Sequence, residues 1–460
     1  MTSGVAMSHR PRWKSLVAAT AVGAVLALSA CTPGGGGDDE SKDAKPDDIS
    51  TDVASMGDVT LSVWDQEVRG GQAKQIETLN AAFEEKYPNV TIERTSKSFD
   101  DLQKTVRLAI TNDDAPDVVQ VNNGRADMGQ FVSAGLIQSL DGYAEVYGWE
   151  ERYPESVRST ASYSKDGKTF GEGSLFGMPQ VGEMVGLWYN KAKLGSLGLE
   201  PPKTLDELDA AMKAAKAAGE LPVQLGNAEA WPAIHDYAVA MNQYVPRDDV
   251  RALGYGRKGA SWTSEENVEG ADLFVSWVKA GYLTPEFDAV PNDTAWRNFA
   301  KGEGVFMIGG TWYQADLEEA MGDNLGFALP PVGPVGEPAV TGGTGLPLAI
   351  TDASKNADAA AAYIDFLTDA NAMKVIQENG GLPVVDGDAA AAQGAAKEVI
   401  AAWSTVTEQD SLVPYLDWAT PDMSDLMGQQ LQKLSQGSID TTAFLDALET
   451  NYSEFTDKNE

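Results

Sequence analysis

Polar and aromatic side chains follow three predicted strands of this sequence, at the point where each strand ends. The strands and the residues that follow them are 59–63 with Trp64, Asp65 and Glu67, 118–121 with Asn122, Asn123 and Arg125, and 305–308 with Gly309, Gly310 and Trp312. In an open α/β sheet, ligands bind beyond the carboxyl ends of the strands. Tryptophan stacks on the C–H faces of a sugar ring, while carboxylates, amides and guanidinium groups bind its hydroxyls. The three strand ends together favour a sugar site.

Other kinds of site find little support in the residue types. The chain has one cysteine, Cys31, and two histidines, His9 and His235, which exclude an internal disulfide and argue against a zinc site or histidine-based catalysis. The segment Gly254–Gly259 fits the dinucleotide-binding pattern G-x-G-x-x-G, but the charged segment Arg247–Arg251 precedes it where that pattern requires a strand. We therefore expect no cofactor, no metal ion and no catalytic residue.

The composition limits the class of protein and of partner. The chain has 460 residues, more than one ordinary core of about 100–200 residues, so we expect at least two core regions. It carries 69 Asp and Glu against 34 Lys and Arg, a formal net charge of −35. Such a charge repels phosphate backbones and argues against a nucleic-acid partner.

Predicted strands alternate with predicted helices along the chain. Apolar patterns predict strands at 59–63, 90–92, 117–121, 186–189 and 304–308, and helices at 76–87, 99–110 and 357–379. The segment Thr204–Glu207 is a capping box that begins a further helix, and Gly380–Gly381 ends the long one. This alternation is typical of an α/β protein with a parallel sheet.

The first thirty residues have the features of a secretory signal peptide. Basic residues precede an apolar run at 15–30, which is shorter than the roughly 20 residues that a membrane-spanning helix needs. The run ends in Leu28–Cys31, which resembles a bacterial lipobox with a lipidated cysteine; the alternative is an ordinary signal peptide with a chance cysteine. The next segment, 31–57, is rich in Gly, Asp and Ser, which predicts a disordered tether and a folded part from about Asp58.

A series of short motifs occurs in the order found in one protein family. They are AAFEEKYPNVTIE, Ala115–Val119, Val132–Ile137, Gly177–Pro179, Tyr189–Lys191, Pro202–Glu207, Phe299–Met307 and Thr341–Gly345. Each motif is loose alone, but their order and spacing from about Asp58 to Tyr452 are specific. The chain resembles the family 1 extracellular solute-binding proteins, the maltose-binding-protein-like lipoproteins that capture sugars for ABC importers.

The resemblance implies a two-lobe periplasmic-binding-protein type II fold. In this α/β fold both lobes are discontinuous and are joined by hinge crossings, with the ligand in the cleft between them. Lobe I would comprise residues 58–181 plus 347–392, and lobe II residues 183–342 plus 400–455.

The resemblance also implies a set of ligand-binding residues at the positions that match the family motifs. They are Trp64, Asp65, Glu67, Asn122, Asn123, Arg125, Glu183, Asn227, Glu229, Trp231, Trp312, Gly343 and Trp418. Val121 departs from the family pattern, which has an aromatic residue near this strand end. Simpler interpretations stay open for Glu183, as a hinge ion pair, and for Trp231, as a core residue. The tryptophans expected to serve packing alone are Trp262, Trp277, Trp296 and Trp403.

By resemblance, the function is reversible capture of a neutral di- or oligosaccharide and its delivery to the membrane permease of an ABC importer, with a cytoplasmic ATPase behind it. The protein would be a monomer, anchored by lipid on Cys31 at the extracytoplasmic face of the bacterial membrane. One alternative keeps the fold but binds a polyamine, a glycerol phosphate or a peptide. The other is an extracellular glycosidase, which needs two carboxylates about 5–10 Å apart.

Overall fold

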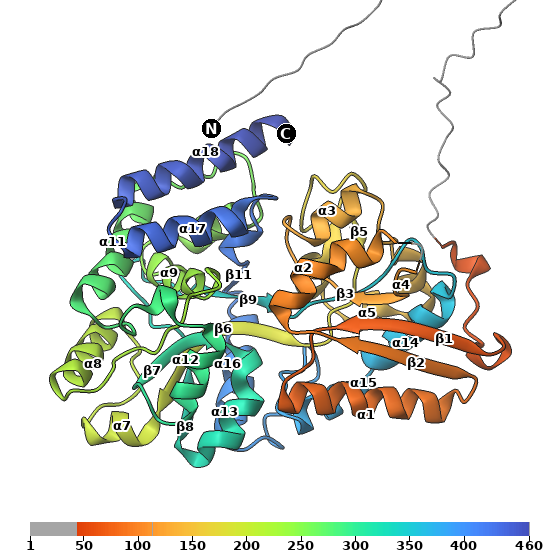
Figure 1. Ribbon diagram of the computed structural model, residues 1–460, viewed down its shortest axis with the longest axis horizontal. Coiled ribbons are helices and arrows are strands. Elements are labelled where there is room, and N and C mark those ends of the chain that lie inside the picture. The colour runs from red at the N-terminus through yellow and green to blue at the C-terminus, as the bar shows by residue number, and fades with distance from the viewer. Residues whose placement is uncertain (1–43, 113, 460) are drawn as a thin grey trace, which may run out of the picture. The chain divides into compact units, whose positions relative to one another are not determined.

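The computed structural model describes residues 44–112 and 114–459 (Figure 1). The expected signal peptide at 1–30, the expected lipidation site Cys31 and the first part of the expected tether lie outside the described residues. Within the described ranges, no helix is both long enough and apolar enough to cross a membrane.

The first sheet has four strands in the order β10-β3-β1-β2. They are β1 (Val59–Asp65), β2 (Val90–Ser96), β3 (Val118–Gln120) and β10 (Leu348–Ile350). β1 pairs in parallel with β2 and β3, and β10 is antiparallel to β3. Every second residue of β1 is buried, which confirms the alternation that predicted this strand.

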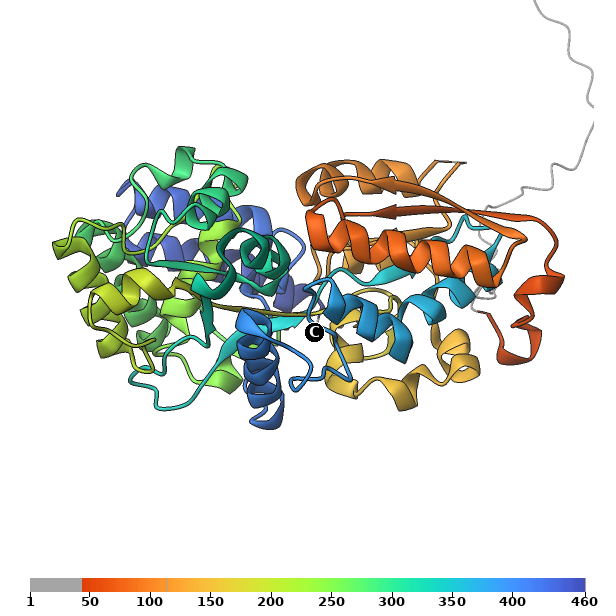
Figure 2. The ribbon, with the colours of Figure 1, turned by 90° about the horizontal axis from the view of Figure 1, so that it is seen from below.

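Helices pack on this sheet, and together they form what we call lobe I. α1 (Gly70–Lys86) follows β1 and α2 (Phe99–Ile110) follows β2, as the apolar spacing predicts. α1 contacts α14 (Ala357–Leu367) and α15 (Ala370–Glu378), and Figure 2 shows these helices side by side. The shorter elements of the lobe are α3 (Met128–Ser133), α4 (Asp141–Tyr147), α5 (Trp149–Arg152), α6 (Glu155–Arg158), β4 (Ser162–Tyr163) and β5 (Ser174–Leu175).

The prediction of one long helix at 357–379 is wrong. The segment forms two helices, α14 and α15, with a break at Thr368 and Asp369. The Asp369 carboxylate accepts hydrogen bonds from the backbone N–H groups of Asn371 and Ala372, both at 2.8 Å, and so caps a new helix. The predicted end is confirmed, since Gly380 follows α15 with a φ of 77°.

The second sheet has the order β11-β9-β6-β7, with β8 paired to β6. Its strands are β6 (Gly182–Asn190), β7 (Phe306–Gly310), β8 (Leu325–Ala328), β9 (Val340–Thr344) and β11 (Leu412–Val413). β6 is antiparallel to β7, β8 and β9. The expectation of a parallel sheet is therefore wrong here: β6 leads the chain into this sheet and β9 leads it back, so the two neighbours run in opposite directions.

The second sheet and the helices around it form lobe II. The helices are α7 (Lys191–Ser196), α8 (Leu205–Ala217), α9 (Pro232–Met241), α10 (Arg247–Gly254), α11 (Glu265–Ala280), α12 (Asn292–Ala300), α13 (Gln314–Met321), α16 (Gly394–Glu408), α17 (Met423–Ser435) and α18 (Thr441–Asn459). The capping box of Thr204 and Glu207 is present at the start of α8. The packing tryptophans are buried as expected: Trp262, Trp277, Trp296 and Trp403. Gly254 ends a helix rather than following a strand, so the dinucleotide motif lacks its context.

Three chain segments cross between the lobes. The first enters β6, which Figure 1 shows running from lobe I into the second sheet. The second joins β9 to β10, and the third joins α15 to α16. Backbone hydrogen bonds connect them, from Gly345 N–H to Val181 O at 3.0 Å and from Gly182 N–H to Leu382 O at 2.9 Å. Each sheet thus contains strands from both of the sequence ranges that were expected for its lobe. The exact boundaries of the lobes stay a prediction.

The folded part of the chain begins earlier than the expected Asp58. Residues 46–48 and 53–55 form short 3₁₀ helices, and Val53 is 1% exposed against the lobe I core. The side-chain amide of Asn89 donates to the carbonyl oxygens of Val53 and Gly57, at 2.9 and 2.7 Å. The prediction of a disordered tether is therefore wrong for its last part, up to Gly57, because Val53 packs against the core of lobe I.

Candidate functional site

The end of β1 is fixed by an ion pair. Asp65 is 1% exposed, and its two carboxylate oxygens accept hydrogen bonds from the Arg94 guanidinium at 2.6 and 2.7 Å. Asp65 also accepts from the backbone N–H of Glu67 at 2.9 Å, and Arg94 donates to the Glu67 carbonyl oxygen at 2.6 Å. Trp64 is half-buried, with the Lys97 ammonium 4.4 Å from its ring centroid. Asp65 therefore shapes the loop that carries Glu67.

Glu67 turns one carboxylate oxygen toward protein and leaves the other unpaired. Oε1 accepts a hydrogen bond from the Gln120 amide at 2.9 Å. Oε2 has no hydrogen-bond partner among the described residues, although the side chain is only 4% exposed. Burial raises the pKa of Glu67, the hydrogen bond from Gln120 opposes this rise, and the charge of Asp65 adds to it.

The loop after β3 joins the two lobes rather than opening toward solvent. Asn123 is 1% exposed and donates to the Thr160 carbonyl oxygen at 2.9 Å and to Thr344 Oγ1 at 3.4 Å, where β9 leaves lobe II. Asn122 donates to the Asp127 carboxylate at 3.1 Å. Both amides thus hold the loop in place.

Arg125 bridges the lobes with its side chain. Its guanidinium donates to carbonyl oxygens of lobe II, those of Tyr255 at 2.8 Å and Ala419 at 3.2 Å, and to that of Lys168 in lobe I at 3.1 Å. Its backbone N–H donates to the Trp418 carbonyl oxygen at 3.2 Å. The residue is 3% exposed. These contacts make Arg125 a link between lobes, and its predicted contact with a ligand stays a prediction.

Glu183 lies where β6 leaves the hinge, paired in register with Gly343 of β9. Burial, and next the charge of Glu67, raise the pKa of Glu183 to about 8, while the charge of Arg69 opposes the rise. Among the residues that the structure describes, no ion pair or hydrogen bond ends on its carboxylate. The interpretation of Glu183 as a hinge ion pair therefore finds no support.

Glu67 and Glu183 line one small pocket of about 20 Å³. The pocket lies at the hinge, and both lobes contribute to its walls. Its other lining residues are Gln72, Gln75, Val181, Gly182, Thr311, Trp312, Ala315, Gly380, Gly381 and Leu382. Two carboxylates thus face a space that is also bounded by an indole ring.

An aromatic wall extends from this pocket along lobe II. We give this name to Trp231, His235, Trp312, Tyr415 and Trp418. Neighbouring ring centroids are 5.4 Å apart for His235 and Trp312, 5.6 Å for His235 and Tyr415, and 4.8 Å for Tyr415 and Trp418. The Trp231 ring lies 6.5 Å from that of Trp312. Trp312 is the member of the wall that lines the pocket, while His235, Tyr415 and Trp418 are buried against one another.

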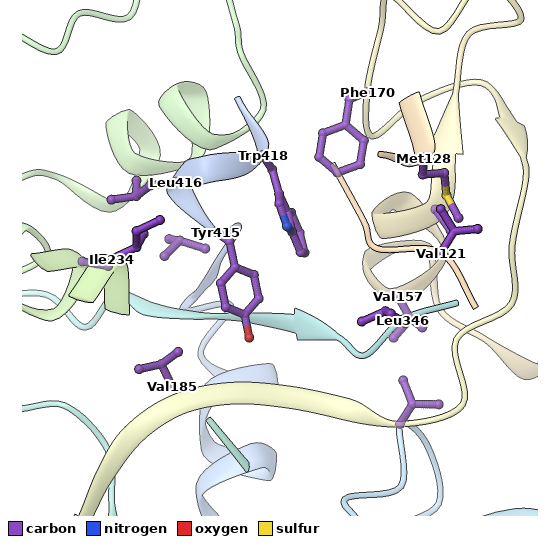
Figure 3. Close-up of a cluster of buried hydrophobic side chains, with 14 of the residues drawn as sticks. Val121, Met128, Val157, Phe170, Val185, Ile234, Leu346, Tyr415, Leu416 and Trp418 are labelled. Carbon is purple, nitrogen blue, oxygen red and sulfur yellow. The ribbon is translucent and has the colours of Figure 1, made fainter. Parts of the chain in front are cut away.

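Local geometry positions the ends of this wall. The ring of Trp312 lies over the end of β7, where a Cβ on Gly310 would come within 1.9 Å of it, so only glycine fits. Trp418 is 5% exposed, and its ring packs against Gly124 and lies 5.8 Å from that of Phe170 in lobe I. Figure 3 shows Trp418 between Tyr415 and Phe170, with the Tyr415 hydroxyl directed toward β6. Gly343 leaves room for the Trp418 ring, 3.5 Å from where its Cβ would stand.

Trp231 contacts lobe I, while Asn227 and Glu229, which were predicted with it, form hydrogen bonds that fix loops. The Trp231 ring lies 5.8 Å from that of Phe99, and the residue is only half-buried, which does not favour its interpretation as a core residue. Asn227 is fully buried and accepts from the Ala233 N–H at 3.0 Å, at the start of α9. Glu229 accepts from the Asn292 N–H at 2.9 Å.

His235 and Tyr415 belong to the wall and were missed by the sequence reasoning. His235 lies one helical turn after Trp231 on α9, a spacing that places both on one face and could have identified it. Burial lowers the pKa of His235 to about 4, so the ring is neutral at pH 7. His235 Nδ1 and the Tyr415 hydroxyl have no hydrogen-bond partner in the described part of the chain. Both are polar groups that a ligand could satisfy.

Comparison with known families assigns the chain. A family model described as "Bacterial extracellular solute-binding protein" matches residues 67–374, about two thirds of the sequence. The chain belongs to this family. The match confirms the resemblance seen in the short motifs.

Relatives with curated descriptions are distant. A "Multiple sugar-binding protein" of Streptococcus mutans is 22% identical over 66% of this chain and 70% of its own length. An "Uncharacterized ABC transporter extracellular-binding protein" of Pyrococcus horikoshii is 24% identical over 55% of each chain. The match thus spans about half the length of the Pyrococcus relative.

Solved structures share the fold over most of the chain. A "Chitin oligosaccharide binding protein" is 19% identical, with a TM-score of 0.72 over 87% of this chain and 100% of its own. "Maltose bound T. maritima MalE3" is 19% identical, with a TM-score of 0.69 over 86% of this chain and 99% of its own. The two-lobe α/β fold expected from the sequence is therefore confirmed.

Within this family fold, the structure sorts the predicted site residues into two groups. Glu67, Glu183 and Trp312 meet in one pocket, and Trp231 and Trp418 continue from it in the aromatic wall. The others hold loops, the lobe interface or the hinge: Trp64, Asp65, Asn122, Asn123, Arg125, Asn227, Glu229 and Gly343. That each of the thirteen residues contacts a ligand stays a prediction.

Proposed function

We propose that this solute-binding protein captures a di- or oligosaccharide between its two lobes and delivers it to the membrane permease of an ABC importer. The observation that carries the proposal is the aromatic wall, whose rings continue from a pocket with two carboxylates at the hinge. A chain of stacking faces next to hydrogen-bonding groups suits consecutive sugar rings better than a single small solute.

The names of similar proteins support a saccharide as the solute. The Streptococcus relative is described as a multiple sugar-binding protein, and the two solved structures above are described by chitin oligosaccharide and by maltose. A glycerol phosphate finds less support, because the pocket between the lobes is lined by two carboxylates and by no basic residue.

The mechanism that we propose is hinge closure. Contacts between the lobes form only when they approach, and they include the bonds from Arg125, the Arg257–Glu172 ion pair at 2.7 Å and the Phe99–Trp231 ring contact. A sugar that touches both lobes adds to these contacts and shifts the population to the closed form. The permease would recognise and bind that closed form.

The anchoring and the partners are part of the same proposal. Lipid on Cys31 would hold the protein at the extracytoplasmic face of the cell membrane, where a permease with its cytoplasmic ATPase would receive the sugar. We expect a monomer that needs no cofactor and binds no nucleic acid. Mass spectrometry of the protein from membranes tests the first point, since a lipidated Cys31 at the mature N-terminus adds the mass of its acyl chains.

Tryptophan fluorescence and calorimetry test the central claim. The purified protein is titrated with neutral and charged mono-, di- and oligosaccharides, and then with polyamines, glycerol phosphates and short peptides as non-sugar solutes. Saturable binding of a saccharide, weakened in Trp312→Ala but kept in Trp312→Phe, supports the proposal. Saturable binding of a non-sugar solute alone, or no binding of any saccharide, contradicts it.

Two carboxylates in one pocket are also what a glycosidase uses, so catalysis needs its own test. We propose that the bound sugar leaves unchanged. Incubation of the protein with chromogenic glycosides and with the tightest-binding saccharide, followed by an assay for new reducing ends, decides between the two. Turnover that disappears in Glu183→Gln would replace the binding protein with a hydrolase.

A further inference from the structure

The pocket at the hinge combines features that a neutral sugar hydroxyl does not require. Glu67 and Glu183 line it from the loop after β1 and from the start of β6, and the charge of Glu67 raises the pKa of Glu183. Oε2 of Glu67 is buried without a partner, and no donor among the described residues reaches the Glu183 carboxylate. Two carboxylates that line one small space, that of Glu67 buried and that of Glu183 half-buried, favour either a bound proton or a bound cation.

No basic side chain in the described part of the chain forms an ion pair with Glu67 or Glu183, although the charge of Arg69 lowers the pKa of both and that of Arg94 lowers the pKa of Glu67. Arg94 is held by both carboxylate oxygens of Asp65. Arg69 is near enough to lower the pKa of Glu183, but its guanidinium donates to Gln72 at 3.1 Å and lies 5.5 Å from the Tyr313 ring centroid. No ion pair between a basic residue and either glutamate occurs in residues 44–112 and 114–459.

The size and the wall of the pocket fit one small cation. Its volume of about 20 Å³ holds one water-sized group, since a water needs about 10–15 Å³. An ammonium group has this size and donates three hydrogen bonds, which the free Glu67 oxygen and the Glu183 carboxylate can accept. Trp312 lines the same pocket, and an indole face attracts a cation.

We propose that the saccharide carries a protonated amino group, which enters the pocket between Glu67 and Glu183 while the attached sugar ring lies along the aromatic wall. The inference rests on the proposed function and replaces the expected neutral sugar with an amino sugar. The pair then acts as the specificity element of the site: the ammonium group takes the place of the proton that the two carboxylates otherwise share.

The release of a proton on binding distinguishes an amino sugar from a neutral ligand. The groups around Glu183 are Glu67 and Arg69 on the segment after β1, and Tyr415 on the segment before residues 416–418. Below pH 8 the pair holds a proton, and binding of an ammonium group releases that proton to the buffer. We therefore expect the Kd for an amino saccharide to fall by up to about tenfold per pH unit between pH 5.5 and 7.5.

Calorimetry with matched ligands tests the proposal. The purified protein is titrated with saccharides in three versions that differ at one position: a free amine, an N-acetyl group and a hydroxyl. Each set covers mono-, di- and oligosaccharides, in two buffers of different ionisation enthalpy. We expect the amine to bind at least about tenfold tighter than the hydroxyl version and to release close to one proton.

Variants separate the pair from the rest of the site. Glu183→Gln and Glu67→Gln should abolish both the preference for the amine over the hydroxyl version and the proton release. The matched control is Glu93→Gln, on the exposed side of β2, which should change neither. The melting temperature of each variant shows that it has folded.

The outcomes distinguish this inference from the proposed function. Equal or tighter binding of the hydroxyl version, without proton release, overturns the amino-sugar inference and leaves saccharide capture standing. Saturable binding of a polyamine without binding of any saccharide overturns both saccharide capture and the amino-sugar inference. Failure of all amines and all saccharides overturns both.

Discussion

The two lobes contribute to the site in different ways. Lobe I brings polar residues to its strand ends, and most of them are already bonded to protein: Asp65 to Arg94, Asn123 to Thr160 and Arg125 to carbonyl oxygens. Lobe II brings rings that contact one another edge to face or at a tilt. Lobe I therefore mainly sets geometry, and lobe II mainly contributes the aromatic rings of the proposed binding surface.

This difference has a physical reason. A polar side chain that is buried when the lobes meet costs free energy unless it is hydrogen-bonded, so the polar loops of lobe I are paired within the protein. An aromatic ring has few or no polar atoms that must be hydrogen-bonded, so the rings of lobe II can pack on one another without polar partners. Glu67 from lobe I and Glu183 at the hinge depart from this division.

The largest expected effect is on stability and comes from lobe I. Asp65→Asn breaks a buried bidentate ion pair, and we expect the free energy of unfolding to fall by about 3 kcal/mol. Urea denaturation followed by circular dichroism measures it. Sugar affinity at a temperature where the variant is folded should change less than about threefold. A large loss of affinity with unchanged stability would make Asp65 a ligand contact and contradict the division between lobes.

The next effect is on affinity and comes from lobe II. Trp312→Ala removes a half-buried ring that lines the pocket, and we expect a loss of about 2 kcal/mol in binding, roughly thirtyfold in Kd. Trp312→Phe keeps an aromatic face and should lose much less. Calorimetry gives the Kd, and thermal unfolding should shift little for either variant. Equal binding by all three proteins would remove Trp312 from the site.

Arg125 should affect the lifetime of the closed form. Arg125→Met deletes the hydrogen bonds to Tyr255 and Ala419 that join the lobes, and we expect an increase of about tenfold in the dissociation rate with a smaller change in the association rate. Stopped-flow fluorescence measures both rates. Arg257→Gln is the matched control, since its ion pair with Glu172 also joins the lobes but is solvent-exposed. A larger effect in the control would contradict the role of Arg125.

The sequence predicted the elements well where a local pattern decides them. The alternation of Val59, Leu61 and Val63 fixes β1, and Thr204 with Glu207 fixes the start of α8. Trp312 was found because a glycine pair and a strand end precede it. These signals are all contained within a few neighbouring residues, so they can be read without knowing the rest of the fold.

The role of Arg125 could not be predicted in the same way. Its acceptors are carbonyl oxygens that lie 130 and 294 residues further along the chain, and a carbonyl has no sequence signature. The break between α14 and α15 depends on the cap formed by Asp369, which an apolar pattern alone does not reveal. The packing of Val53 on lobe I was missed because a composition rich in Gly and Asp outweighed one apolar residue.

The smallest expected effect is on the pH dependence of stability. It concerns Glu183 at the hinge, which belongs neither to the hydrogen-bonded polar residues of lobe I nor to the aromatic wall of lobe II. The pKa of Glu183 is raised to about 8 in the folded protein, so the group favours folding when protonated. Its contribution is fully present below the unfolded pKa of about 4.5 and is lost as the pH rises through 8. The pKa of His235 is lowered to about 4, so His235 favours folding when it is neutral. Its contribution to stability is present above its unfolded pKa of about 6.5 and is lost as the pH falls from there toward 4.

The two groups can be separated by the pH range and by a variant. Between pH 6.5 and 9, where His235 stays neutral, we expect the melting temperature of the free protein to fall by about 1–2 °C more than that of Glu183→Gln. Differential scanning calorimetry in buffers of matched ionic strength measures this difference. If both proteins gave the same slope, Glu183 would be ionised in the free protein, and lobe I and the hinge would then present two charged carboxylates to the aromatic wall rather than a pair that shares a proton.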